Sequence, residues 1–80
     1  MLVPLYGFLK GDSLGLLVLV HDHELVKEVG VKLQEAASVR VAPKAHAEVY
    51  FRGALLDPNL TVAEAGLEAL ERVDVVAKDA

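Results

Sequence analysis

The feature that most constrains this 80-residue chain is a change in the spacing of its apolar residues near residue 24. Before that point, the runs at 2–9 and 14–20 are short and rich in leucine and valine, and the segment KGDS between them is typical of a hairpin loop. After it, apolar residues recur at helical spacing and form one stripe. These residues are Val26, Val29, Leu33 and Ala37. The chain must therefore place a helix against a sheet, because neither element buries its apolar side alone.

The helix is expected to begin at Glu24 and to run for about fourteen residues. Asp22 or His23 is in position to cap its first turn, since short polar side chains accept hydrogen bonds from the orphan amides there. Glu28 and Lys32 are four residues apart in the favourable order, which predicts an ion pair along the helix surface.

The rest of the chain predicts further strands. EVYFRG at 48–53 alternates between apolar and polar residues, ALLDPNL at 54–60 is a brief extended piece closed by a turn, and 73–78 alternates again. Thr61 and Glu64 have the spacing of a capping box, which predicts a one-turn helix. The expected order is strand, strand, helix, strand, short strand, one-turn helix, strand.

Pro4 and Gly30 are awkward for the elements in which they lie. Pro4 has no N–H to donate to a neighbouring strand, so regular pairing of the first strand is expected to begin only at Leu5. Glycine inside a helix costs about 1 kcal/mol relative to alanine, so Gly30 is expected to mark close packing of the helix on the sheet.

Composition excludes several classes of function. The chain has no cysteine, so it can form no disulfide and no thiolate zinc site. Its net charge of −4 argues against a nucleic-acid or anionic-membrane partner. No apolar run approaches the roughly 20 residues of a membrane span, and the first residues lack the features of a signal peptide. We expect one domain over residues 1–80, located in the cytoplasm.

With the order of elements established, the chain resembles the ubiquitin-like β-grasp over nearly its whole length. The most specific stretch is VYFRGALLDPNLTVAEAGLEALERVDVV. The positions that match the ubiquitin spacing are Leu56, Thr61, Val62, Ala65, Gly66, Leu67, Val73 and Val75. The resemblance implies an α+β fold: a mixed four- to five-stranded sheet packed on one α-helix, plus a one-turn helix.

Within that superfamily the chain is similar to the protein B family of the toluene 4-monooxygenase system, the hydroxylase gamma subunits of bacterial aromatic monooxygenases. The matching segments are DSLGLLVLV, the helix positions Val26, Val29, Lys32 and Leu33, RVAP at 40–43, and LTVAEAGLEALERVDVV at 60–76. The resemblance implies a non-catalytic accessory subunit docked on the larger subunits of a di-iron hydroxylase. The iron ligands and catalytic residues are then expected in another chain, and no cofactor in this one.

Two alternatives remain open at the level of the sequence. The chain could be a free-standing bacterial ubiquitin-like interaction domain, similar to the small component of type VII secretion systems and able to self-associate. It could also be a sulfur carrier, but those proteins resemble one another in ending with Gly-Gly. This sequence ends with Lys78, Asp79 and Ala80, so that function is expected to be absent.

Candidate chemical sites are few. HDHE at 21–24 places His21 and His23 two residues apart, but two histidines without a second motif are more often a polar approach to a helix than a metal site. Glu64 is better explained as a helix cap, and Asp74 as an outward residue of a strand. We therefore expect neither a catalytic residue nor a metal site.

The outer face of the sheet is the candidate binding surface. If alternate residues of the second strand point inward, then Leu17 and Leu19 point outward, where Tyr50 and Val76 lie by the same alternation. Scattered apolar residues are ordinary on protein surfaces. Tyrosine and arginine beside aliphatic residues, however, are typical of interface cores, with Arg40 and Arg52 as a possible polar rim. The pattern favours a docking patch.

Overall fold

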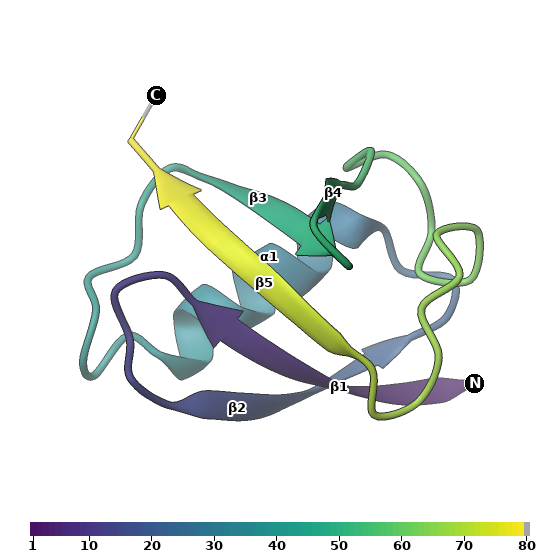
Figure 1. The fold of residues 1–80 in the computed structure, drawn as a ribbon, viewed down its shortest axis with the longest axis horizontal. Coiled ribbons are helices and arrows are strands. Elements are labelled where there is room, and N and C mark those ends of the chain that lie inside the picture. Colours follow the sequence, from purple (N-terminus) through teal and green to yellow (C-terminus); the bar gives the residue numbers. More distant parts are fainter. Residues whose placement is uncertain (80) are drawn as a thin grey trace.

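The computed structural model describes residues 1–79 and has the predicted α+β architecture, in which a five-stranded mixed sheet packs on one helix (Figure 1). The strand order is β2-β1-β5-β3-β4; β1 and β5 are parallel, and the other neighbours are antiparallel. Ala80, the last residue of the ending discussed above, lies outside the described residues. The elements in chain order are β1 (Leu2–Leu9), β2 (Gly15–His21), α1 (Val26–Ala36), β3 (His46–Phe51), β4 (Ala54–Leu55) and β5 (Arg72–Lys78).

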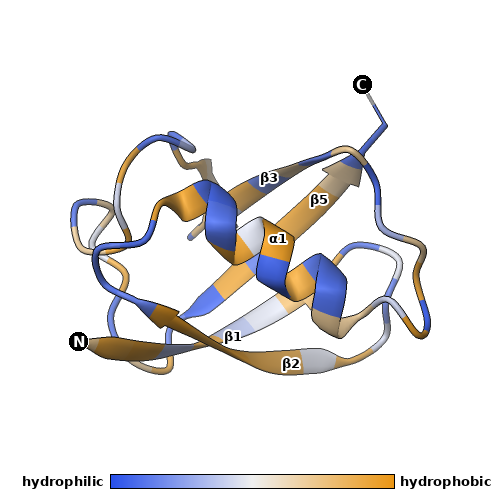
Figure 2. Ribbon diagram, turned by 180° about the vertical axis from the view of Figure 1, so that it is seen from behind, coloured by the Kyte–Doolittle hydropathy of each residue, from blue (hydrophilic) through white to orange (hydrophobic). Residues whose placement is uncertain are grey.

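The core lies between α1 and one face of the sheet, as the alternation of apolar residues predicts. The helical stripe is fully buried: Val26, Val29, Leu33 and Ala37. The inward residues of the strands are buried opposite it: Val3, Leu5, Leu9, Val18, Val20, Val49, Val73 and Val75. Figure 2 shows the hydrophilic residues of α1 on its surface away from the sheet. At 11 residues, the helix of the described chain is well below the roughly 20 that a membrane span needs.

The start of α1 differs from the prediction. The helix begins at Val26 and has 11 residues, and neither Asp22 nor His23 caps it, because its N-cap residue, Leu25, forms no side-chain cap hydrogen bond. The backbone of the loop before Thr61 takes that role instead. The Val26 N–H donates to the Leu60 carbonyl at 2.8 Å, and the Lys27 N–H donates to the Pro58 carbonyl at 3.2 Å.

The expected pairing limit at Pro4 is also wrong, because β1 pairs with β2 from Leu2 onward and Pro4 lies opposite Leu19. The reason is the direction in which the Pro4 nitrogen points. Two residues later, the Tyr6 N–H points away from β2 and donates to the Glu71 carbonyl beside β5. Pro4 shares that orientation, since backbone groups repeat every two residues. The missing N–H of Pro4 is therefore on the β5 side of β1, at a level that β5 does not reach, since β5 begins at Arg72 opposite Tyr6.

The segment at 61–66 forms a turn where a one-turn helix was predicted. Its capping box is present: the Thr61 N–H donates to Glu64 Oε1 at 2.9 Å, and the Glu64 N–H donates to Thr61 Oγ1 at 3.1 Å. Gly66 ends the turn with φ of +77°, a conformation in which glycine is favoured.

Gly30 lies where the helix approaches β3 most closely, which gives the first prediction. An alanine Cβ at position 30 would lie 2.9 Å from the Cβ of Ala47. Overpacking costs about 1–3 kcal/mol, and the gain in helix propensity is about 1 kcal/mol. We therefore expect Gly30→Ala to lower the free energy of unfolding, measured by urea denaturation.

The control for this prediction is a compensating change on the strand. Ala47→Gly removes the Cβ that the new side chain at position 30 meets. The free energy of unfolding of the double variant Gly30→Ala/Ala47→Gly should therefore be higher than the sum of the two single effects predicts. A Gly30→Ala variant more stable than the wild type would contradict the close contact between helix and sheet.

Candidate docking surface

The outer face, meaning the face of the sheet turned away from α1, is the side seen in Figure 1. In β1 and β2 its residues are those that alternate with the buried ones. Across these two strands Tyr6 pairs with Leu17, and Pro4 pairs with Leu19. Leu17 is 54% exposed and Leu19 is 50% exposed, so both side chains lie on the surface as the alternation predicts.

The four outward residues named from the sequence fall into two groups. Leu17 and Leu19 lie on β2 at one edge of the sheet, whereas Tyr50 and Val76 lie on β3 and β5 and are half-buried. The strand order places β1 between the two groups. An ion pair between Arg72 and Asp74, at 2.9 Å, also lies between them on the outer side of β5.

Charged groups surround Tyr50 and Val76. Glu48 lies opposite Val76 in the sheet. Its carboxylate binds Lys78 Nζ at 2.9 Å and accepts a hydrogen bond from Tyr50 Oη at 3.2 Å. This part of the outer face is therefore a polar network.

The sequence reasoning missed the contribution of β1 to the outer face. Tyr6 is 45% exposed and Leu2 is 50% exposed, and both lie on the same side of the sheet as the leucines of β2. The signal was the alternation in LVPLYGFL, whose interpretation was hindered by the uncertain pairing of the first strand. We use the name apolar patch for these neighbouring residues of β1 and β2: Leu2, Pro4, Tyr6, Leu17 and Leu19.

The two arginines expected at the rim differ in position. Arg52 is exposed in the turn between β3 and β4, with its guanidinium 4.9 Å from the centre of the Phe51 ring and 3.5 Å from a Glu71 carboxylate oxygen. Arg40 instead binds Asp12 at 2.9 Å and ties the loop after β1 to the segment after α1. The structure therefore does not group Arg40 with the outer face.

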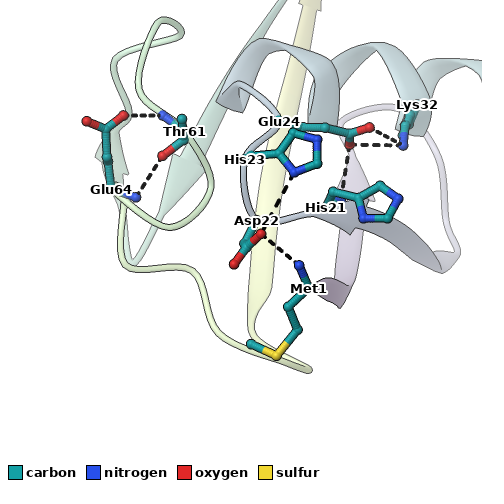
Figure 3. Close-up of polar contacts among 8 residues, drawn as sticks. All are labelled: Met1, His21, Asp22, His23, Glu24, Lys32, Thr61 and Glu64. Atoms are coloured by element: carbon teal, nitrogen blue, oxygen red, sulfur yellow. Dashed lines mark hydrogen bonds and ion pairs between the residues drawn. The ribbon is translucent and has the colours of Figure 1, made fainter.

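The HDHE segment connects β2 with the helix (Figure 3). Asp22 accepts a hydrogen bond from the Met1 ammonium at 2.9 Å, and Glu24 binds Lys32 Nζ at 3.0 Å. Lys32 thus pairs with Glu24 in place of the predicted Glu28. The rings of His21 and His23 stack with centroids 5.3 Å apart.

The carboxylates considered as candidate sites have structural partners in the described chain. Within residues 1–79, no group of three or more histidine, aspartate or glutamate side chains could hold a metal ion. Glu64 caps the turn at 61–66, and Asp74 pairs with Arg72 on the outer face, so each carboxylate has a structural partner.

The ion pairs predict how stability depends on pH. The Lys32 ammonium bonded to Glu24 lowers the pKa of that carboxyl group, and Arg40 and Lys78 do the same for the pKa of Asp12 and Glu48. A carboxyl whose pKa is lower when folded adds stability above its unfolded pKa and loses that contribution as the pH falls. We expect the free energy of unfolding to decrease below about pH 4. Urea denaturation from pH 7 to pH 3 measures this decrease.

A single variant provides the control. Lys32→Met removes the cation that lowers the pKa of Glu24, so stability of this variant should change less with pH than that of the wild type. An equal pH dependence in both proteins would contradict the role of this pair.

Solved structures share this arrangement of helix and sheet. A chain of the structure described as "Toluene 4 monooxygenase HD Complex with Inhibitor 4-Bromobenzoate" superposes with a TM-score of 0.88 and 28% sequence identity, covering 98% of this chain and 100% of that one. A ubiquitin of Caldiarchaeum subterraneum superposes with a TM-score of 0.80 at 14% identity, covering 98% of this chain and 95% of its own. A designed protein based on ubiquitin gives 0.78 at 19% identity, with 99% and 92% covered.

The two ubiquitin-related structures show the fold alone, which is the predicted ubiquitin-like β-grasp. A comparison with curated protein sequences gives no significant match. The family model described as "Toluene-4-monooxygenase system protein B (TmoB)" matches residues 2–76, which is nearly the whole chain. The chain belongs to the toluene-4-monooxygenase system protein B (TmoB) family.

Proposed function

We propose that the chain is a non-catalytic, gamma-type accessory subunit of a bacterial multicomponent aromatic monooxygenase. The observation that carries this proposal is the family match over residues 2–76. A solved chain of a toluene 4-monooxygenase complex is also covered over its full length. The iron ligands and catalytic residues of the enzyme then belong to another chain, and this one acts through protein contacts.

The apolar patch supports docking through the outer face. Tyr6, Leu17 and Leu19 adjoin one another across β1 and β2, and each is about half exposed or more. Contiguous apolar side chains with a tyrosine among them are typical of interface cores. The proposed docking surface also includes Tyr50, Arg52 and Val76, which form its more polar part.

The position of β2 gives a second reason to expect a partner. This strand is at an edge of the sheet, and its residues 15–20 carry no charge to discourage pairing with another chain. Lys32 Nζ covers part of the edge by donating to the Leu19 carbonyl at 3.2 Å. A larger subunit bound to the apolar patch would cover the part of this edge that lies next to the patch.

Co-expression tests the proposed function. The chain is expressed with the large subunits of a di-iron aromatic hydroxylase and the mixture is separated by size exclusion. We expect this chain to co-elute with them at one copy per large chain. A lone peak of this chain beside a correctly folded hydroxylase would contradict the proposal.

Two further results would favour the alternatives. Elution of the isolated chain as a dimer that dissociates when Leu17 is replaced by glutamate would support a self-associating interaction domain. A thiocarboxylate at the carboxyl end, detected by mass spectrometry of protein isolated from its source, would support a sulfur carrier.

A further inference from the structure

The charges of this chain are unevenly distributed between the outer face and the rest of the molecule. The whole chain has 8 basic and 12 acidic residues. By strand register, two basic residues (Arg72 and Lys78) and two acidic ones (Glu48 and Asp74) lie on the outer face. The remaining six basic and ten acidic residues lie elsewhere in the sequence. The charges of the outer face are therefore balanced, whereas the rest of the chain is acidic.

Arg72 is held in place on this face by three neighbouring strands. Its guanidinium lies 4.1 Å from the centre of the Phe8 ring. That ring in turn covers Gly15 on β2, where an added Cβ would lie 2.6 Å from ring carbons. Asp74 Oδ1 accepts hydrogen bonds from Arg72 Nε at 3.3 Å and from Nη2 at 2.9 Å. The arginine is thus oriented before any partner arrives.

The guanidinium retains donors for a partner. Of its five N–H groups, the hydrogen bonds to Asp74 engage two, and the side chain is 64% exposed. The edge formed by Nη1 and Nη2 can therefore still receive a carboxylate in the two-bonded geometry that makes such pairs strong.

The surroundings of Arg72 combine apolar and charged groups. Tyr6 of the apolar patch is its neighbour in the sheet. On the other side, a shallow hollow of about 380 Å³ lies between Arg72 and Arg52, and its lining also includes Phe51, Leu70, Glu71 and Asp74. A side chain that enters this hollow meets apolar surface and two guanidinium groups, each beside a carboxylate of this chain.

We propose that Arg72 receives a carboxylate of the partner, presented beside apolar side chains that cover the apolar patch. This inference rests on the proposed function, so the partner is a large subunit of the hydroxylase. A second copy fits less well. On its outer face a second copy would offer the carboxylates of Glu48 and Asp74, which are already paired with Lys78 and Arg72.

The test compares two charge reversals of equal size. Arg72→Glu changes the outer face, and Lys27→Glu makes the same change in net charge on α1. Binding of each variant to the purified hydroxylase large subunits is measured by calorimetry at two salt concentrations. We expect Arg72→Glu to weaken binding tenfold or more and Lys27→Glu to change it by less than threefold. Arg72→Lys keeps the charge but loses the planar guanidinium that can bond a carboxylate twice. Its effect on binding should therefore lie between the effects of the two charge reversals.

The outcomes separate the two proposals. If the wild-type chain does not bind the large subunits, both the proposed function and this inference are wrong. If it binds and the two charge reversals weaken binding equally, only the inference is wrong. Self-association of the isolated chain that Arg72→Glu removes would assign the surface to a second copy and overturn the inference. If Arg72→Glu does not fold, Arg72→Gln replaces it, with a smaller salt dependence of binding as the expected result.

Discussion

Replacing Leu33 with alanine is expected to lower the free energy of unfolding by about 2–5 kcal/mol, the range for large-to-small changes in a core. The side chain of Leu33 is completely buried on α1. It also fills the space above Gly7 of β1, where an added Cβ would lie 2.8 Å from Leu33 Cδ1. The absent side chain of Gly7 provides the room, and Gly7 has no side chain that could move into the cavity.

The expected loss is large for a domain of this size. At about 0.05–0.15 kcal/mol per residue, a chain of 80 residues has roughly 4–12 kcal/mol of stability in total. Leu33→Ala could therefore remove a third or more of it. Urea denaturation followed by circular dichroism measures the change.

Val31 on the same helix is the matched control. It is 45% exposed, so Val31→Ala removes little buried surface, and alanine has the higher helix propensity. Its effect should remain within about 0.5 kcal/mol. Equal losses from the two substitutions would contradict the placement of the helix on the sheet.

The core and the fold class could be predicted because they depend on local spacing. A helical stripe ending in Leu33 and Ala37, and alternation through Val73 and Val75, each specify which side of an element is buried. Placing these sides together leaves few arrangements of one helix and a sheet. The structure confirms the residues that meet in the core.

The start of the helix could not be predicted in the same way. Its first amides bind carbonyl groups of Pro58 and Leu60, more than thirty residues away in the sequence. Polar side chains close in sequence, such as Asp22, do not cap the helix. A partner on a distant backbone leaves no signal in the residue types around the helix start.

The sequence predicts which residues lie on the outer face, but it does not predict which of them are neighbours. Alternation correctly places Leu17 and Tyr50 on the side away from the helix, since period-two spacing alone decides this. Which strands adjoin depends on the crossover that inserts β1 and β5 between β2 and β3. That insertion separates Leu17 from Tyr50, whereas Tyr6 lies beside Leu17 because β1 and β2 form a hairpin.

The same separation gives the last prediction, which concerns docking. Leu17→Glu places a charge in the apolar patch, and we expect it to weaken binding to the hydroxylase large subunits by about 30-fold or more, as for a hot-spot residue. The substitution leaves the core intact, so circular dichroism should show a folded chain. Leu17→Lys should cost less than Leu17→Glu, because the proposed partner surface carries a carboxylate near Arg72.

Val31→Glu is the control for this prediction, because it introduces the same charge at an exposed aliphatic residue on the helical side. The exposed fractions of the two residues are similar, at 54% for Leu17 and 45% for Val31. Tyr50→Glu distinguishes the two parts of the outer face. If Tyr50→Glu abolishes binding while Leu17→Glu leaves it unchanged, the partner docks on the polar network of β3 and β5. The apolar patch is then not the interface.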